Sequence, residues 1–427
     1  MKIKVNISLI LTYIYAFFLI YSPNFSYIIK INNFILLGIF TFFMLLTMMP
    51  QIRLLREKIR LKAIVYFIVM IIFSIIYYVI RTLIAGTNIT DINNLRIIQG
   101  LMPIMYLLGT LIVYIRLDNN NKIIDKYDFI IKVGLIQSII CIMMIFFNEF
   151  RNIAINIFYS NHELNKYITA SRLYGICDGD YTYSFQILQS IIALLAFTYG
   201  NNKNKKKYYL YSIIILFSTV LNGRWGIVVF AVGVLLCLLY SAFINGKIFQ
   251  TMKMIILLII VGGIGITLII KFLPNTVVLF THAINDILSF LNNGEHTETG
   301  RLMEMILFPV GINIIFGCGY RIFGLKGINY GFTKSSDVGF SNDMFMGGII
   351  YVFMLYSPYI NFYKITNNNA HKGSLEKIFS KVLLVAFLLS NFKGEVFRSE
   401  LLNTIFILLS VFMLFESQRG VVEKTNE

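Results

Sequence analysis

Three arginines in this chain lie close to a glycine and beside a long apolar stretch. Arg172 lies in S-R-L-Y-G, Arg224 in N-G-R-W-G and Arg301 in T-G-R-L-M-E. An arginine at the edge of the hydrocarbon is costly and usually has a function. Its planar set of N–H donors fits phosphate and carboxylate groups. The three arginines therefore predict a site for an anionic, lipid-linked ligand.

Each arginine also has a structural explanation. Arg172 can extend along the membrane surface and pair with one of the two aspartates that follow it. Trp225, the only tryptophan, can anchor the Arg224 turn at the membrane interface. Arg301 has acidic neighbours and can be an ordinary hydrated loop residue. Arg224 is the strongest candidate, because only five residues separate the apolar runs around it.

Two aspartates occur in the stretch S-S-D-V-G-F-S-N-D-M-F. Asp337 is the predicted catalytic carboxylate, because a carboxylate at the membrane edge can take a proton from a sugar hydroxyl. Asp343 is expected to cap a helix, because it lies where a helix begins.

Lys393, Glu395 and Arg398 lie between the last two apolar runs. Charged residues buried at this depth need partners, so these three either pair with one another or contact a substrate. They are secondary candidates for the site.

The cysteines and acidic residues predict no metal site. No C-x-x-C motif occurs, and the acidic residues and histidine near Arg301 match no metal-ligand spacing. Cys177 and Cys318 are compatible with a disulfide or with two free thiols.

The composition is that of a helical integral membrane protein. Hydrophobic residues make up 57% of the 427 residues and charged residues 14%, whereas soluble domains have roughly 25% charged residues. The net charge of +16 comes mainly from short loops, which indicates membrane topology rather than binding of nucleic acid.

The apolar runs predict twelve transmembrane helices in one membrane domain, residues 1–427. The expected spans are 5–22, 34–50, 63–84, 97–115, 129–147, 182–199, 208–222, 225–243, 254–273, 343–363, 380–397 and 401–416. Positive charges follow every even-numbered span, which places both termini in the cytoplasm.

Two outer loops are longer than a simple connection. They cover about 148–181 and about 273–342. Long loops commonly carry function. Within the second loop, 276–292 and 301–316 have apolar residues at helical spacing and predict short helices.

The chain resembles the bacterial O-antigen and capsular repeat-unit polymerases of the Wzy type, which are related to the O-antigen ligases. The resemblance covers the layout of nearly the whole chain. It is carried locally by the R-L-Y-G, G-R-W-G and G-R-L-M segments, by F-G-C-G-Y, and by S-D-V-G-F before the tenth span.

The resemblance implies a glycosyltransferase C-like fold in the bacterial inner membrane. It implies an enzyme that needs no metal or cofactor and moves the growing glycan from undecaprenyl diphosphate to the nonreducing end of a lipid-linked repeat unit. A chain-length regulator and a flippase are candidate partners. On this basis Arg172, Arg224 and Arg301 would hold diphosphates, Arg224 and Asp337 being catalytic.

Three alternatives remain open from the sequence. O-antigen ligases are expected to carry a histidine near Ser336–Asn342, and its absence here favours a polymerase. A lipid-linked oligosaccharide flippase also has about twelve spans, but it has similar halves and short loops. A non-enzymatic component of a polysaccharide assembly complex is the third alternative.

Overall fold

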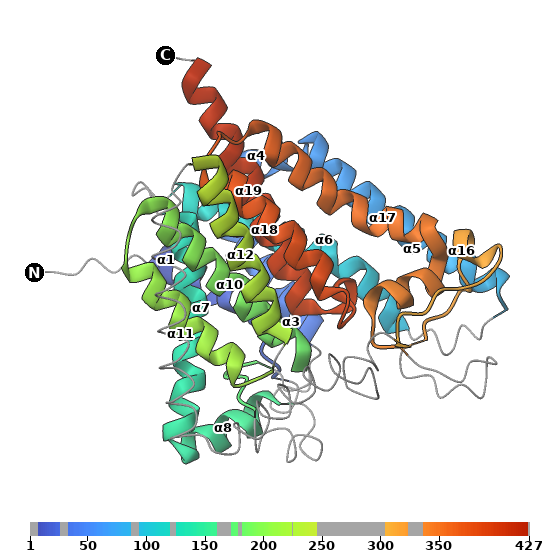
Figure 1. Ribbon diagram of the computed structural model, residues 1–427, viewed down its shortest axis with the longest axis horizontal. Coiled ribbons are helices and arrows are strands. Elements are labelled where there is room, and N and C mark those ends of the chain that lie inside the picture. The colour runs from blue at the N-terminus through green and yellow to red at the C-terminus, as the bar shows by residue number, and fades with distance from the viewer. Residues whose placement is uncertain are drawn as a thin grey trace, which may run out of the picture.

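The computed structural model describes residues 7–25, 33–86, 94–119, 125–159, 172–177, 182–223, 225–245, 304–322 and 336–425. All regular elements in these ranges are helices (Figure 1). They are α1 (Ile7–Tyr21), α3 (Asn33–Leu46), η1 (Met49–Gln51), α4 (Ile52–Ile59), α5 (Lys62–Ile84), α6 (Asn94–Asn119), α7 (Lys126–Phe146), α8 (Asn148–Phe158), α10 (Thr182–Lys203), α11 (Lys207–Val220), α12 (Trp225–Asn245), α16 (Asn313–Phe316), α17 (Gly339–Asn369), α18 (Leu375–Ser390), η2 (Val396–Arg398) and α19 (Glu400–Thr425).

The described helices identify a multi-pass membrane protein. Seven of them are long and apolar enough to cross a membrane. The number of membrane spans rises to eight if α3 and α4, which are bent by 75° relative to each other, form one span. Helices α1, α11 and α18 coincide with further expected spans but are shorter. The ninth expected span, 254–273, lies outside the described residues, as does 276–292. The count of twelve therefore stays a prediction.

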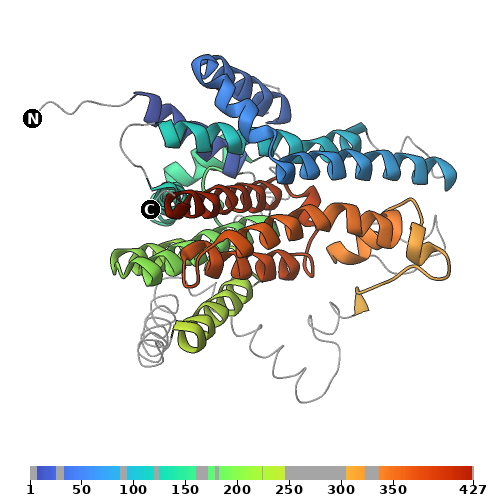
Figure 2. The same ribbon diagram turned by 90° about the horizontal axis from the view of Figure 1, so that it is seen from above.

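Helices α10 and α19 form the centre of the bundle. The apolar windows of these two helices are 94% and 89% buried, whereas that of α5 is 33% buried. Helix α10 packs against α7, α11, α12, α18 and α19 (Figure 2). It carries buried polar side chains that bond inside the bundle: Ser190 Oγ donates to the Gly226 carbonyl at 2.6 Å. Such polar contacts are a usual means of helix association in membranes.

Helix α17 is two helical segments separated by a break at Gly348. Gly348 has φ +65° and ψ −163°, a backbone conformation open to glycine but strained for other residues. The chain at 315–317 packs into the break, and Cys318 N–H donates to the Phe345 carbonyl at 2.6 Å. The break is thus filled by protein backbone, as irregular backbone within a membrane requires.

The segment 304–322 corrects one prediction. A continuous helix over 301–316 is wrong for the described part, because 306–312 is not helical and only α16, Asn313–Phe316, forms a single turn. Pro309 removes a backbone donor, and Gly311 takes φ +62°. Arg81 of α5 holds the turn by donating to the Gly317 carbonyl and to Asn313 Oδ1.

The bundle has two polar ends. Segments 172–177, 222–223, 225–226, 336–343 and 391–399 meet at one end, here called the Arg172 end. At the opposite end Lys126 pairs with Asp118 at 3.1 Å and with Glu416 at 2.7 Å. Ionic groups therefore lie on both sides of an apolar middle, as expected for a chain that spans a membrane.

Replacing Gly348 with alanine tests the break in α17. A Cβ at Gly348 would lie 2.3 Å from the Ile315 carbonyl oxygen, so Gly348→Ala should destabilise the fold by about 1–3 kcal/mol. Gly38→Ala is the control, because nothing lies within 4 Å of a Cβ there. Thermal unfolding of the detergent-solubilised protein measures both, and equal midpoints for the two variants would contradict the strain at Gly348.

Candidate functional site

The segment that begins with Arg172 is held by the side chain of Asn222. Leu173 N–H donates to Asn222 Oδ1 at 2.9 Å, and Asn222 Nδ2 donates to the Leu173 carbonyl at 2.6 Å. An amide side chain carries an NH2 donor group next to a carbonyl acceptor. It can therefore bond to both the N–H and the C=O of one residue, as a neighbouring β-strand does. Asn222 begins the N-G-R-W-G turn, so two of the predicted arginine motifs are in direct contact.

A side chain of α7 and the side chain of Tyr159, directly after α8, fix Tyr174. Gln137 Nε2 donates to the Tyr174 carbonyl at 2.7 Å, and Tyr174 N–H donates to the Tyr159 hydroxyl at 3.0 Å. Leu173 and Tyr174 are buried, so all their backbone groups need such partners. The backbone that carries Arg172 is therefore rigidly placed.

The guanidinium of Arg172 lies near the Tyr174 hydroxyl. Burial raises the pKa of the Tyr174 hydroxyl to about 12, and the nearby positive charge of Arg172 partly opposes this. Arg172 itself is half-buried. Part of Arg172 is therefore accessible from outside the described bundle. The other two predicted arginines, Arg224 and Arg301, lie outside the described residues.

Trp225 connects the N-G-R-W-G turn to the end of α18. Its indole Nε1–H donates to the Leu389 carbonyl at 3.2 Å. The indole therefore bonds within the bundle, which the expectation of a simple interfacial anchor did not include. The following Gly226 N–H donates to Gln186 Oε1 of α10 at 3.1 Å.

The loop between α18 and α19 packs against the beginnings of α10 and α17. Gly339 N–H donates to the Asn391 carbonyl at 2.8 Å, and the Tyr183 hydroxyl donates to the Glu395 carbonyl at 3.3 Å. The backbone of Gly394 packs directly against the Tyr183 ring. A Cβ atom on Gly394 would lie 2.1 Å from Cε2 of Tyr183. These contacts place Glu395 and Arg398 inside the bundle.

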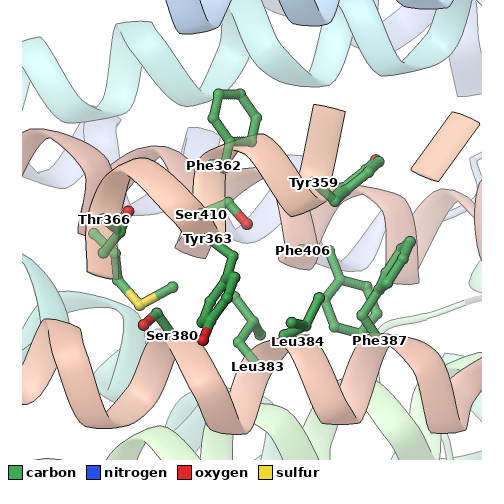
Figure 3. A pocket seen from close by; sticks show the side chains of 11 residues that line it. Tyr359, Phe362, Tyr363, Thr366, Ser380, Leu383, Leu384, Phe387, Phe406 and Ser410 are labelled. Carbon is green, nitrogen blue, oxygen red and sulfur yellow. The ribbon is translucent and has the colours of Figure 1, made fainter. Parts of the chain in front are cut away.

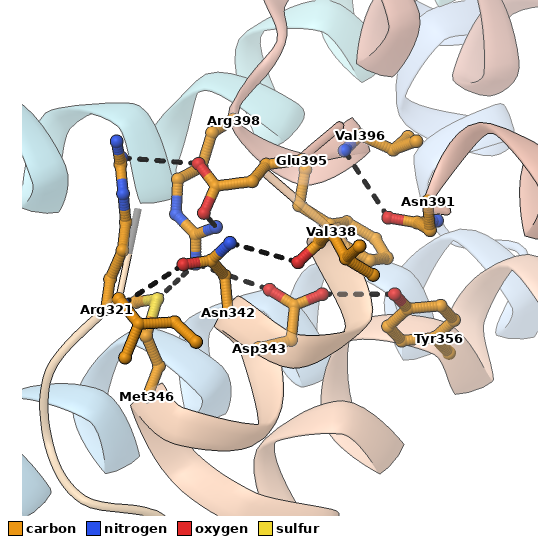
Figure 4. Close-up of polar contacts among 12 residues, drawn as sticks. Arg321, Val338, Asn342, Asp343, Met346, Tyr356, Asn391, Glu395, Val396 and Arg398 are labelled. Carbon is orange, nitrogen blue, oxygen red and sulfur yellow. Dashed lines mark hydrogen bonds and ion pairs between the residues drawn. The ribbon is translucent and has the colours of Figure 1, made fainter. Parts of the chain in front are cut away.

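Four charged residues form a buried ionic cluster, which comprises Arg321, Asp343, Glu395 and Arg398 (Figure 4). Arg398 Nη2 lies 3.3 Å from Asp343 Oδ1, and Arg398 Nη1 lies 2.5 Å from Glu395 Oε1. Arg321 Nη1 lies 3.3 Å from Glu395 Oε2. The Tyr356 hydroxyl donates to Asp343 Oδ2 at 3.0 Å.

The ionic cluster pairs groups of opposite charge. Its two guanidinium groups face two carboxylates, and the side chains of Asp343 and Arg398 are 1% and 11% exposed. Burial disfavours the charged form of Arg398, but the carboxylates of Glu395 and Asp343 outweigh this, so the pKa of its guanidinium is raised. Arg398 is thus a permanent cation at the Arg172 end.

The ionic cluster corrects one prediction and resolves another. Asp343 is not a helix cap: Val338 holds that position without a side-chain bond, and Asp343 is one turn inside α17, fully buried. Glu395 pairs with Arg398 and Arg321. Lys393 is half-buried and has no ion pair with any described residue.

Asp337 lies at the start of α17 and is half-buried, between the buried residues Ser336 and Val338. Asn342 fixes this stretch, since its Nδ2 donates to the carbonyls of Ser336 and Val338 at 2.9 and 3.0 Å. No ion pair joins Asp337 to another residue in the described ranges. Its carboxylate therefore has a rigid backbone and an accessible side chain.

A small cavity lies within the bundle, among α17, α18 and α19 (Figure 3). Its volume is about 20 Å³, and aromatic rings such as Tyr359, Phe387 and Phe406 line it without a charged group. Its walls are those of a packing void rather than a binding site.

Among the described residues, no group of three or more histidine, cysteine, aspartate or glutamate side chains could hold a metal ion. All four cysteines are free thiols, including Cys177 and Cys318.

The chain matches no protein-family model and no curated protein at a significant level.

The ionic cluster contains two residues that the sequence did not mark for this site. Arg321 was not singled out, and Asp343 was assigned to a cap. The available signal was charge within or beside an apolar run, which demands a partner. Their partners come from distant positions of the chain, so the sequence alone could not pair them.

Replacing Arg398 with methionine should be strongly destabilising. The change leaves the buried carboxylates of Asp343 and Glu395 without their shared cation, and removing one partner of a buried pair costs about 3–5 kcal/mol. Arg53→Met is the control: its ion pair with Glu57 is 90% and 57% exposed and should contribute less than about 1 kcal/mol. Thermal unfolding in detergent compares them, and similar losses would contradict the importance of the cluster.

Proposed function

We propose that this protein is a polysaccharide polymerase of the outer face of the bacterial cytoplasmic membrane. It transfers the growing glycan from undecaprenyl diphosphate to the nonreducing end of an incoming lipid-linked repeat unit. Both termini would then lie in the cytoplasm, and the Arg172 end would face outward. The fold would be glycosyltransferase C-like.

The observation that carries the proposal is the contact between Asn222 and Leu173. It joins the R-L-Y-G segment to the N-G-R-W-G turn, two motifs on which the resemblance to the polymerases rests. A diphosphate has several anionic oxygens and is bound well by more than one guanidinium. Arg172 and Arg224 are proposed to bind it together, with Arg301 as the third cation.

The reaction breaks the bond between the anomeric carbon of the growing glycan and the diphosphate oxygen. The electron pair stays on undecaprenyl diphosphate, and the arginines stabilise the negative charge that develops there. The acceptor hydroxyl oxygen forms the new bond to the anomeric carbon. Asp337 takes its proton, for which an accessible carboxylate on a rigid backbone is suited.

A transporter of lipid-linked oligosaccharides is the second candidate. The break of α17 at Gly348 and the buried ionic cluster beside it favour this candidate, because transporters commonly use broken helices and intramembrane charges. The long outer loop expected at about 273–342 favours the polymerase, because transporters of this kind have similar halves and short loops. An O-antigen ligase would act on the same donor with a different acceptor.

Elongation in detergent distinguishes these candidates. The purified protein, given undecaprenyl-diphosphate-linked repeat units, should form a ladder of longer lipid-linked glycans, because polymerisation needs no second compartment. A transporter or a ligase would leave single repeats under these conditions. In cells, deletion should leave one repeat unit on the surface glycan, whereas loss of a ligase would leave the long glycan on its carrier.

Two single changes test the arginine site. Arg172→Lys keeps the charge but loses the planar donor set, and Asn222→Leu removes the bonds that hold Leu173. Each should lower the elongation rate about tenfold or more, since a misplaced binding group can cost about two orders of magnitude. Arg53→Lys, on α4 at the opposite end of the bundle, is the control. Unchanged rates for Arg172→Lys, Arg224→Lys and Arg301→Lys together would refute the proposed site.

A further inference from the structure

A cavity of about 40 Å³ lies between α5, α6 and α17, next to the ionic cluster. Five polar side chains line it: Ser74 and Tyr78 of α5, Gln99 of α6, Tyr351 of α17 and Arg398 of η2. Apolar side chains, among them Ile75 and Pro103, form the other walls. The space corresponds to about three water molecules or one small chemical group.

The Tyr78 hydroxyl is an unused hydrogen-bond donor in this cavity. Tyr78 is 5% exposed, and its hydroxyl has no hydrogen-bond partner among the described residues. Buried polar groups normally have partners. The centroids of the Tyr78 and Tyr351 rings are 5.9 Å apart, and Arg398 lines the same cavity.

The charges beside the cavity select the kind of ligand. Asp343 and Glu395 already pair with Arg398 and Arg321, so an added anion would have to compete with these carboxyl groups in a buried site. An uncharged acceptor satisfies the Tyr78 O–H without this competition. The apolar walls suit a methyl or methylene group attached to that acceptor.

We infer that this cavity is a subsite for the acyl-amide group of an N-acylated sugar. The amide carbonyl accepts a hydrogen bond from the Tyr78 hydroxyl, and the acyl methyl group packs against Ile75 and Pro103. The inference rests on the proposed function for its saccharide ligand, and it makes the N-acylated sugar a specificity determinant of that function.

The test uses saturation-transfer NMR on the purified full-length protein in detergent. The probe is the methyl glycoside of N-acetylglucosamine, and methyl glucoside is the comparison ligand. The acetyl methyl protons should receive saturation from the wild-type protein. Tyr78→Phe should weaken binding about two- to tenfold, the effect of one hydrogen bond, and methyl glucoside should bind both proteins equally weakly.

Tyr78→Phe removes a hydroxyl that bonds to no described residue, so its unfolding midpoint should match that of the wild type. Thr404→Val is the matched control, because Thr404 Oγ1 is also buried without a partner and Thr404 does not line the cavity. Equal binding of the probe by wild type and Tyr78→Phe, or no binding by the wild type, overturns the subsite. Elongation of lipid-linked repeats is measured separately, so that result leaves the proposed polymerase intact.

Discussion

The Arg172 end of the bundle depends on the pairing of Arg398 with Asp343 and Glu395. This pairing joins the first half of α17 to the loop between α18 and α19, and Arg321 extends it to the segment 304–322. A single buried charge in this apolar bundle would be prohibitive, so none of these segments can move away alone. The ionic cluster therefore fixes the geometry of three chain segments at once.

Side-chain amides do the same for neutral backbone groups. Side-chain amides at the Arg172 end bond to main-chain groups of loops or of the first turn of a helix, and they belong to Asn222, Gln137, Gln186, Asn342 and Asn391. Loops at membrane depth cannot rely on water for their N–H and C=O groups, so the protein must supply the partners. Loops built this way are rigid, which suits a site that positions a charged lipid-linked substrate.

The break in α17 connects these features. Because Gly348 interrupts the helix, Asp343 and Met346 lie on a separate half-helix whose last turn accepts the backbone of Cys318. Arg398 contacts both residues of this half-helix. The proposed acyl-amide subsite lies beside the break, since Met346 and Tyr351, on either side of Gly348, both line it.

The sequence by itself determined the helical membrane class and most helix positions, because long apolar runs can satisfy their backbone in hydrocarbon only as helices. It also placed Arg172 in a loop and marked Glu395 and Arg398 as charges that need partners. It misplaced Asp343 and missed Arg321 and the break at Gly348. Only the tertiary structure decided these, because ion pairs such as Asp343–Arg398 join residues 55 positions apart, and apolar periodicity carries no information about such long-range pairs.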